Sequence, residues 1–475
     1  MKFSNVHLKT SKFSRLINFI LISSFICIIC LSLTLSLFNL HSTKFSYYSD
    51  SLQDLSSSTS LKHIVFGIAS NDRSWRNRKD YVRLWWRPDE MKGCVFLENM
   101  PSNTTLDNDR FANLPPICVS GDTSSFRYTY RNGLRSAIRV ARVVSDTVAL
   151  NHSNVRWFVF GDDDTIFFPD NLVKTLSKYD HGLWYYVGTN SESFVQNKVF
   201  SHEMAFGGAG FAISYPLAKV LAKVFDSCLE RYPHLYGSDG RIHACLSELG
   251  VSLTHEPGFH QMDFRGNIFG FLAAHPVRPL VSLHHTDAMD PIFPNMTKMK
   301  SLEHLFQAVQ IDPHRIIQQT VCYDRWFSWT ISVSWGYAVQ VFPNNVFLPD
   351  ALRMQETYTS WKKNGLNVHY NLNTREHHPD PCRRPPVFYL DQVSSGQDGI
   401  KSTYKKMVSE NCTYDRASPR KLEEIRVFSH KQELDIKQLQ APRRHCCGVL
   451  PNAAGSVMEI NIRECKNEEL ISMHP

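Results

Sequence analysis

The sequence predicts an α/β protein with a mostly parallel central sheet, a β-rich C-terminal region and an N-terminal transmembrane helix. Residues 16–40 are mostly apolar and carry no charge. Residues 130–160 combine a helical spacing of apolar side chains with a continuously apolar run of strand length. This order is typical of a parallel sheet that is covered on both faces. Beyond residue 294, apolar and polar residues alternate, as they do in strands with one buried face.

The apolar segment 16–40 is long enough to cross a bilayer, and no small-residue cleavage site follows it. Four basic residues and no acid precede it, which places the N-terminus in the cytosol by the positive-inside tendency. We therefore expect a cytosolic tail over 1–15, an uncleaved anchor over 16–40 and a Ser-rich stem over 41–61. A cleaved signal peptide is the alternative.

The charge and the cysteines indicate the compartment and the class of partner. The net charge is +7, and no long basic run is present beyond the tail, so nucleic acid is not an expected partner. Ten of the 12 cysteines follow the anchor, an even number that predicts disulfides in an oxidising compartment. Cys446 and Cys447 are adjacent, so we expect them to pair with different partners.

Regular structure is expected from residue 62 onward. His63–Ala69 is an apolar strand-like run, residues 75–88 form a basic, aromatic helix candidate, and residues 93–99 form a second short strand. The next helix has apolar residues at helical spacing and leads into the strand predicted over 155–160; these residues are Leu134, Ile138, Ala141 and Val144.

Three consecutive aspartates, Asp162, Asp163 and Asp164, follow the carboxyl end of that strand. In open α/β sheets ligands bind at this edge, and two carboxylates on a tight turn suit a hard divalent cation. Two alternatives exist. The carboxylates could cap the following helix or project into water. A strand that ends in D-x-D also begins phosphatases of the haloacid-dehalogenase type, with the first Asp as nucleophile.

The C-terminal region, 294–475, has a different pattern. From residue 327 to 341 every second residue is apolar, which predicts one long strand with one buried face. A further apolar run at 385–393 also reads as a strand, so this region is expected to be rich in β-structure.

Several stretches together resemble the Fringe and core β1,3-galactosyltransferase group, glycosyltransferase family thirty-one, and most closely its plant Fringe-related branch. The segment "FVFGDDDTIFFPDN" resembles the metal-binding motif of that group, "MAFGGAGFAISYPLA" resembles its G-G-A-G segment, and "VRLWW" resembles its early R-x-x-W helix. The resemblance covers roughly Lys62 to the C-terminus. It implies a GT-A-like catalytic domain over 62–293.

The same resemblance implies a donor site. Asp164, Asp162 and His284 would bind Mn²⁺ or another divalent cation, with His285 as the competitor of His284. Asp162 or Asp163 could instead hydrogen-bond the ribose. The other donor-binding residues would be Arg83, Gly208 and Gly210.

The resemblance also implies that Asp239 is the catalytic base, braced by a Cys228–Cys245 disulfide. Ser238 and Asp239 could equally cap the helix that follows. Gly240 stands where the plant branch usually carries a second Asp, which puts the local pKa and the positioning of the acceptor in doubt.

The activity that follows from the resemblance is an inverting, Mn²⁺-dependent transfer of a hexose or N-acetylhexosamine from a UDP-sugar. The acceptor would be a glycan or glycoprotein hydroxyl, and the linkage β1,3. The enzyme would be a single-pass type II protein of the Golgi membrane with a luminal catalytic part. A non-catalytic glycan-binding or assembly subunit with the same fold is the alternative.

Overall fold

The computed structural model describes residues 17–19, 21–34, 58–101, 113–361, 369–408, 411–451 and 455–473. The chain divides into two compact units, Met1–Ser58 and Thr59–Pro475. In the first unit, a helix over Ile17–Thr34 has a mean hydropathy of 2.4. By length and composition it could cross a membrane, as the predicted anchor requires, although a signal sequence has the same properties. The predicted tail and residues 41–57 of the predicted stem lie outside the described residues.

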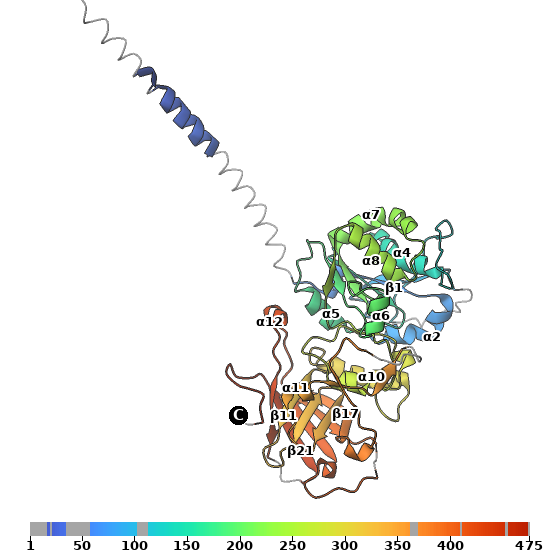
Figure 1. The fold of residues 1–475 in the computed structure, drawn as a ribbon, viewed down its shortest axis with the longest axis vertical. Coiled ribbons are helices and arrows are strands. Elements are labelled where there is room, and N and C mark those ends of the chain that lie inside the picture. The colour runs from blue at the N-terminus through green and yellow to red at the C-terminus, as the bar shows by residue number, and fades with distance from the viewer. Residues whose placement is uncertain are drawn as a thin grey trace, which may run out of the picture. The chain divides into compact units, whose positions relative to one another are not determined.

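The second unit begins with a seven-stranded sheet in the order β3-β2-β1-β4-β7-β6-β8 (Figure 1). Four of its six strand pairings are parallel, and β7 runs antiparallel to both β4 and β6. The predicted α/β class with a mostly parallel sheet is therefore observed. The strands are β1 (Ile64–Ala69), β2 (Lys92–Leu97), β3 (Ile117–Val119), β4 (Trp157–Asp162), β6 (Tyr186–Gly188), β7 (Phe211–Ser214) and β8 (Leu253–His255).

Both faces of this sheet are covered, and its central strands β1, β4 and β7 are buried at almost every position. In β1, Val65 belongs to one apolar cluster and Phe66 to the other. The cluster with Val65 packs under α4, α7 and α8, which lie together at the top of Figure 1. The helices are α2 (Asp72–Arg83), α4 (Ser136–Ala149), α5 (Pro169–Leu176), α6 (Phe194–Val199), α7 (Tyr215–Arg231) and α8 (Ser238–Glu248).

Three two-stranded ladders connect this sheet to the rest of the unit. They pair β5 (Ile166–Phe167) with β10 (Ser282–Leu283), β9 (Phe264–Gly266) with β15 (Tyr358–Ser360), and β14 (Met354–Gln355) with β16 (Thr374–Arg375). The remaining short elements are α9 (Phe269–Ala273), α10 (Lys298–Ile311), α11 (Leu348–Ala351), α12 (Ile436–Gln440), and the 3-10 turns Leu61–His63, Thr286–Ala288, Pro381–Arg383 and Pro419–Lys421.

An eight-stranded sheet makes the C-terminal region β-rich, as predicted, in the order β11-β12-β13-β17-β18-β19-β21-β20. The single long strand predicted over 327–341 is wrong. The chain turns back at Trp335–Tyr337, so β12 and β13 form an antiparallel hairpin. The strands are β11 (Gln319–Tyr323), β12 (Thr330–Ser334), β13 (Ala338–Phe342), β17 (Val387–Gly396), β18 (Gly399–Lys405), β19 (Glu424–Ser429), β20 (Cys446–Leu450) and β21 (Val457–Arg463).

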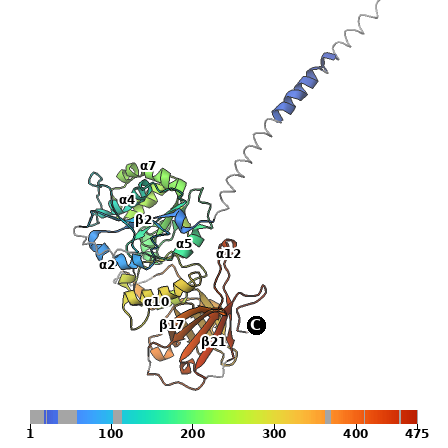
Figure 2. The ribbon, with the colours of Figure 1, turned by 180° about the vertical axis from the view of Figure 1, so that it is seen from behind.

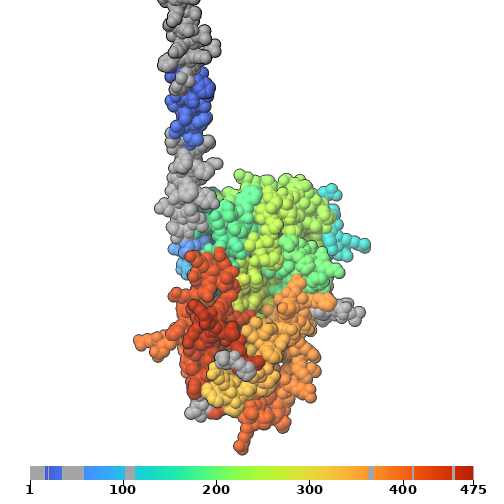
Figure 3. All heavy atoms as spheres, turned by 60° about the vertical axis from the view of Figure 1, so that its left-hand side comes forward, coloured from blue at the N-terminus to red at the C-terminus, as the bar shows by residue number. Residues whose placement is uncertain are grey.

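One apolar cluster continues from the first sheet into the second. It includes Phe66 and Val159 of the first sheet, Phe269 of α9, and Val333 and Val341 of the hairpin. The view from behind in Figure 2 shows α10 between the two sheets, and the space-filling view in Figure 3 shows atoms of both regions in direct contact. The domain boundary predicted between residues 293 and 294 stays a prediction. The apolar cluster contains residues from both sides of this position.

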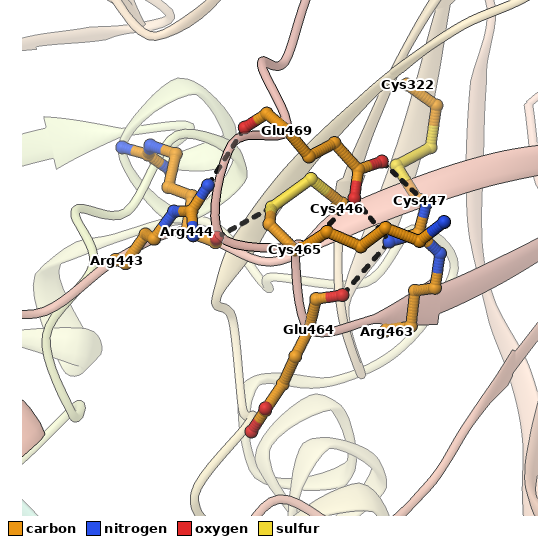
Figure 4. The surroundings of a disulfide bond; sticks show 10 residues. Cys322, Arg443, Arg444, Cys446, Cys447, Arg463, Glu464, Cys465 and Glu469 are labelled. Atoms are coloured by element: carbon orange, nitrogen blue, oxygen red, sulfur yellow. Dashed lines mark hydrogen bonds and ion pairs between the residues drawn. A yellow bond between two sulfur atoms is a disulfide. The ribbon is translucent and has the colours of Figure 1, made fainter.

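All ten cysteines beyond the predicted anchor form disulfides. Cys228–Cys245 joins α7 to α8, as predicted. Cys447 pairs with Cys322 and Cys446 with Cys465, so the adjacent cysteines do have different partners. Figure 4 shows these two bridges side by side. The other pairs are Cys94–Cys118 and Cys382–Cys412.

Candidate functional site

The acidic triplet lies at the carboxyl edge of the first sheet, where β4 ends beside β1. These two strands are parallel, and Ala69, the last residue of β1, pairs with Asp162. From β1 the chain crosses to β2 on one side, whereas β4 lies on the other side. This is a topological switch point, where open α/β sheets leave a crevice for a ligand.

His284 reaches the triplet through the ladder of β5 and β10. Leu283 pairs with Ile166 in antiparallel register. His284 directly follows Leu283, and Asp164 lies two residues before Ile166, so the ladder brings the two side chains together. Asp164 and His284 are 120 positions apart in the chain, so a pattern along the sequence could only suggest their contact.

The described residues contain one cluster of the kind that can bind a metal ion, formed by Asp162, Asp164 and His284. One ligand atom from each lies within 4.8 Å of the others. His284 Nε2 is 3.3 Å from Asp164 Oδ1 and 3.9 Å from Asp162 Oδ2. Both carboxylate oxygens of Asp164 are buried and accept no hydrogen bond, although Oδ1 lies 3.3 Å from His284 Nε2 and 3.3 Å from a guanidinium nitrogen of Arg78. A buried oxygen without a hydrogen bond, such as Oδ2, leaves room for a bound cation as a partner.

The triplet does not project into water as a whole, and it does not cap the following helix. Asp163 and Asp164 are 2% and 1% exposed, whereas the side chain of Asp162 is 39% exposed and lines a cleft. The N-cap of α5 is Phe168, and no side chain caps this helix.

Arg78 is the positive side chain that the sequence analysis missed. Its guanidinium lies 3.1 Å from Asp163 Oδ1 and 3.3 Å from Asp164 Oδ1, and it also pairs with Asp287. The helix that carries it, α2, contains four arginines. Only their positions relative to the buried residues of the helix indicate which of them faces the protein. Arg78 lies three residues after Trp75 and four before Val82, both buried, so it faces the protein.

The electrostatics of the cluster set the protonation states that a cation would meet. Desolvation raises the pKa of Asp162 to about 7, although His284 opposes the change. Desolvation also acts upward on Asp164, but His284 and Arg78 hold its pKa well below the ordinary value. Burial acts downward on His284, yet Asp164 and Asp162 raise its pKa to about 9. A cation must therefore displace a proton from His284, and its affinity should rise with pH.

The G-G-A-G segment makes room for two of these side chains. A Cβ at Gly208 would lie 2.1 Å from Cε1 of His284, and a Cβ at Gly207 would lie 2.6 Å from Oδ1 of Asp239. Gly210 has φ +82° and lies against Phe167. The glycines thus allow protein side chains to approach the backbone.

Asp239 lies in the first turn of α8, and its carboxylate does not act as the predicted cap. The N-cap is Gly237, without a side-chain hydrogen bond. Ser238 Oγ donates to Asp239 Oδ1 at 2.9 Å, and burial raises the pKa of Asp239. A Cβ at Gly240 would meet nothing closer than Leu235 at 3.9 Å, so the space around the backbone does not require glycine here.

Two hollows meet at Asp162. The larger is an open cleft of about 480 Å³, lined by Ser70, Asn71, Arg78, Arg139, Asp162 and Asp163 among others. The smaller is lined by Asp162, Gly207 and Asp239. A cleft of this volume suits a ligand the size of a nucleotide, and Asp239 lies on the adjoining wall.

The ring of His285 contacts that of His284, with centroids 3.7 Å apart, but neither His285 nor Arg83 belongs to the cluster. The ring of His285 stacks on Trp361, with centroids 4.2 Å apart, and its Nδ1 is 3.5 Å from Asp263 Oδ1. Arg83 pairs with Asp80 on its own helix and does not line the cleft. Its predicted role in donor binding stays a prediction.

The chain is similar to a described family, to a curated relative and to solved structures. Residues 196–447 match the family described as "Protein of unknown function, DUF604". A beta-1,3-glucosyltransferase of Mus musculus is 29% identical over 179 residues, which are 34% of this chain and 33% of that protein. The match therefore spans about a third of this curated relative.

Among solved structures, a mannosyltransferase from Pyrobaculum calidifontis in complex with GDP-Man and Mn²⁺ overlaps with 49% of this chain and 69% of that chain. The identity is 14% and the TM-score is 0.24, a degree of overlap that does not establish a shared fold.

Proposed function

The chain belongs to the family described as "Protein of unknown function, DUF604", and we propose that it is an inverting, metal-dependent glycosyltransferase that uses a UDP-sugar. The proposal rests on one arrangement: a cation-type cluster borders a nucleotide-sized cleft, and Asp239 lies on the adjoining wall. The mouse relative, a beta-1,3-glucosyltransferase, supports the same class of reaction. The group transferred would be a hexose or N-acetylhexosamine, in a β1,3 linkage.

The residues of the cluster fit a divalent cation. Two carboxylates and an imidazole suit Mn²⁺ better than Ca²⁺, which prefers oxygen ligands alone. Asp162, Asp164 and His284 would hold the ion, which when bound would neutralise charge on the diphosphate leaving group. Arg78 lines the same cleft and can donate to diphosphate oxygens.

Asp239 would act as the general base. It accepts the proton of the acceptor hydroxyl while that oxygen bonds to the anomeric carbon on the face opposite the diphosphate. The bond from the anomeric carbon to the diphosphate oxygen breaks, UDP leaves with the electron pair, and the configuration inverts. Burial raises the pKa of Asp239, which makes its carboxylate a stronger base.

We further propose a single-pass type II protein of the Golgi membrane whose second unit faces the lumen. Five disulfides in the second unit and the apolar helix of the first support a location in an oxidising secretory compartment.

Titration of UDP with and without Mn²⁺, together with a UDP-release assay across several UDP-sugars, tests the proposal. We expect Asp164→Ala to lose Mn²⁺-dependent UDP binding. Asp239→Asn should retain UDP binding but lower turnover by about a hundredfold or more. Asp398→Asn, at an exposed turn, is the matched control and should resemble the wild type.

Three results would contradict the proposal. Unchanged UDP binding in Asp164→Ala would show that Asp164 does not hold the metal ion. Full turnover in Asp239→Asn would show that Asp239 is not the base. Glycan binding without UDP release from any donor would favour the non-catalytic subunit.

A further inference from the structure

Three aromatic side chains form an exposed surface next to Asp239, and we define Tyr130, Phe200 and Tyr236 as the aromatic platform. They are 46%, 41% and 45% exposed. The ring centroids of Tyr130 and Tyr236 are 5.2 Å apart, and those of Phe200 and Tyr236 are 5.8 Å apart. Contiguous exposed aromatic surface is uncommon on a soluble unit and marks a binding site.

The aromatic platform is assembled from three separate segments, and several contacts hold it in place. Tyr128 Oη donates to the carbonyl of Tyr236 at 2.9 Å, and the amide of Thr129 donates to the carbonyl of Pro233 at 2.8 Å. Arg241, fully buried, donates to the carbonyl of Gly237 at 2.8 Å and lies over the ring of Tyr128. A preorganised surface loses little conformational entropy when a ligand binds.

The aromatic platform adjoins the proposed base on two sides. Tyr236 precedes Asp239 by three residues at the start of α8. The ring of Phe200 contacts Phe206 at 6.2 Å, and Phe206 directly precedes Gly207, which lies against Asp239. The helix α6 ends at Val199, directly before Phe200. The aromatic platform therefore lies next to segments that contact or carry Asp239.

The chemistry of the aromatic platform favours a sugar ring. A pyranose ring has a face of C–H groups that packs on an aromatic face, while its hydroxyls remain available to water and to polar neighbours. Tyrosine hydroxyls at the rim of the rings can serve as such neighbours. None of the three segments is a strand, so none offers an edge for an extended peptide.

We propose that the aromatic platform binds a pyranose ring of a carbohydrate acceptor and presents one hydroxyl to Asp239. This inference rests on the proposed function and specifies its acceptor class: the acceptor is a glycan, and the base acts on a hydroxyl of a sugar that is already attached.

The test measures sugar binding by the full-length chain without any donor. Saturation-transfer NMR is recorded with the methyl β-glycosides of glucose, galactose and N-acetylglucosamine. Tyr236→Ala and Phe200→Ala should weaken binding of at least one of these sugars about tenfold, and Tyr236→Phe should retain it. Phe347→Ala, which removes a 67% exposed ring elsewhere, is the control and should have no effect.

A parallel titration of UDP with Mn²⁺ separates this proposal from the proposed function. If UDP binds normally and the platform variants do not affect sugar binding, the proposal for the aromatic platform is wrong, whereas the proposed function stands. Ring-dependent sugar binding without UDP binding supports the platform and counts against the transferase. Two further results overturn the platform: no sugar of the panel binds the wild type, or the variants change only self-association in sedimentation.

Discussion

Gly208 lies directly beneath His284, and this contact explains why a side chain cannot be accommodated there. The imidazole ring occupies the space where a Cβ would be, with Nδ1 and Nε2 both 2.4 Å from that position. Gly207 has the same relation to Asp239. Sequence reasoning assigned such glycines to close approach by a ligand, whereas here they allow close approach by the side chains that would serve the ligand.

We predict that Gly208→Ala weakens Mn²⁺-dependent UDP binding by about ten- to a hundredfold, because the added methyl must displace His284. Isothermal titration measures the affinity, and circular dichroism shows whether the fold is retained. Gly448→Ala is the control, since a Cβ at Gly448 would have no neighbour within 4 Å. Equal affinities of the two variants would show that His284 does not bind the ion.

His445 should make the protein less stable in acid. Burial and the neighbouring Arg315 lower its pKa from 6.5 to about 4, and Arg315 donates to its Nδ1 at 3.1 Å. Arg315 is also paired with Asp312. Because the folded pKa is depressed, the unfolded chain binds the proton first as the pH falls below 6.5. Stability is therefore lost between about pH 6.5 and 4.

We predict that His445→Gln reduces the loss of unfolding free energy between pH 7 and pH 5 by about 1 to 2 kcal/mol. Urea unfolding at the two pH values measures it. His234→Gln, at an exposed turn, is the matched control. The assignment would be wrong if both variants lost as much free energy of unfolding between pH 7 and pH 5 as the wild type.

Among the elements, the hairpin of β12 and β13 departs most from its sequence pattern. The alternation of apolar residues continues through the turn, because Trp335 and Tyr337 are as buried as the strand residues. Gly336 makes the reversal possible with φ +78°, a conformation in which other residues are strained. The turn is buried against α10, so its residues are apolar. The sequence therefore lacks the exposed, polar residues that usually indicate where one strand ends and the next begins.

We predict that Gly336→Ala lowers the free energy of unfolding by about 1 to 3 kcal/mol through its positive φ and a close contact. Its Cβ would lie 2.7 Å from Ile316 Cδ1 and 3.0 Å from the Cβ of Ala308. Urea midpoints give the change. Gly396→Ala, in the hairpin of β17 and β18, has no neighbour within 4 Å and should cost less. Similar midpoints for both variants would refute the strain.

Over the whole molecule, the eight-stranded sheet curls until its first and last strands, β11 and β20, lie close together. Cys322–Cys447 joins them across a sequence separation of 125, whereas the adjacent Cys446–Cys465 spans 19. The longer loop restricts the unfolded chain more strongly, so the bridge that closes the sheet should contribute more to stability.

We predict that replacing both Cys322 and Cys447 by Ser costs about 1.5 kcal/mol more than replacing Cys446 and Cys465. Urea unfolding without a reductant compares the two double variants, and each variant removes a complete bridge so that no free thiol remains from it. An equal or larger cost for the short bridge would mean that native contacts, and not loop length, determine its value.

The sequence by itself determined the α/β class, the buried strand that precedes the acidic triplet and the even number of disulfide-forming cysteines. These features depend on residues that are near one another in the chain, where periodicity and composition carry the information. The tertiary structure alone decided that Arg78 pairs with Asp163 and Asp164, that His284 and not His285 joins Asp162 and Asp164, and that Tyr130, Phe200 and Tyr236 form one surface. Each of these arrangements depends on strand register or loop packing between distant segments, which a pattern along one chain does not specify.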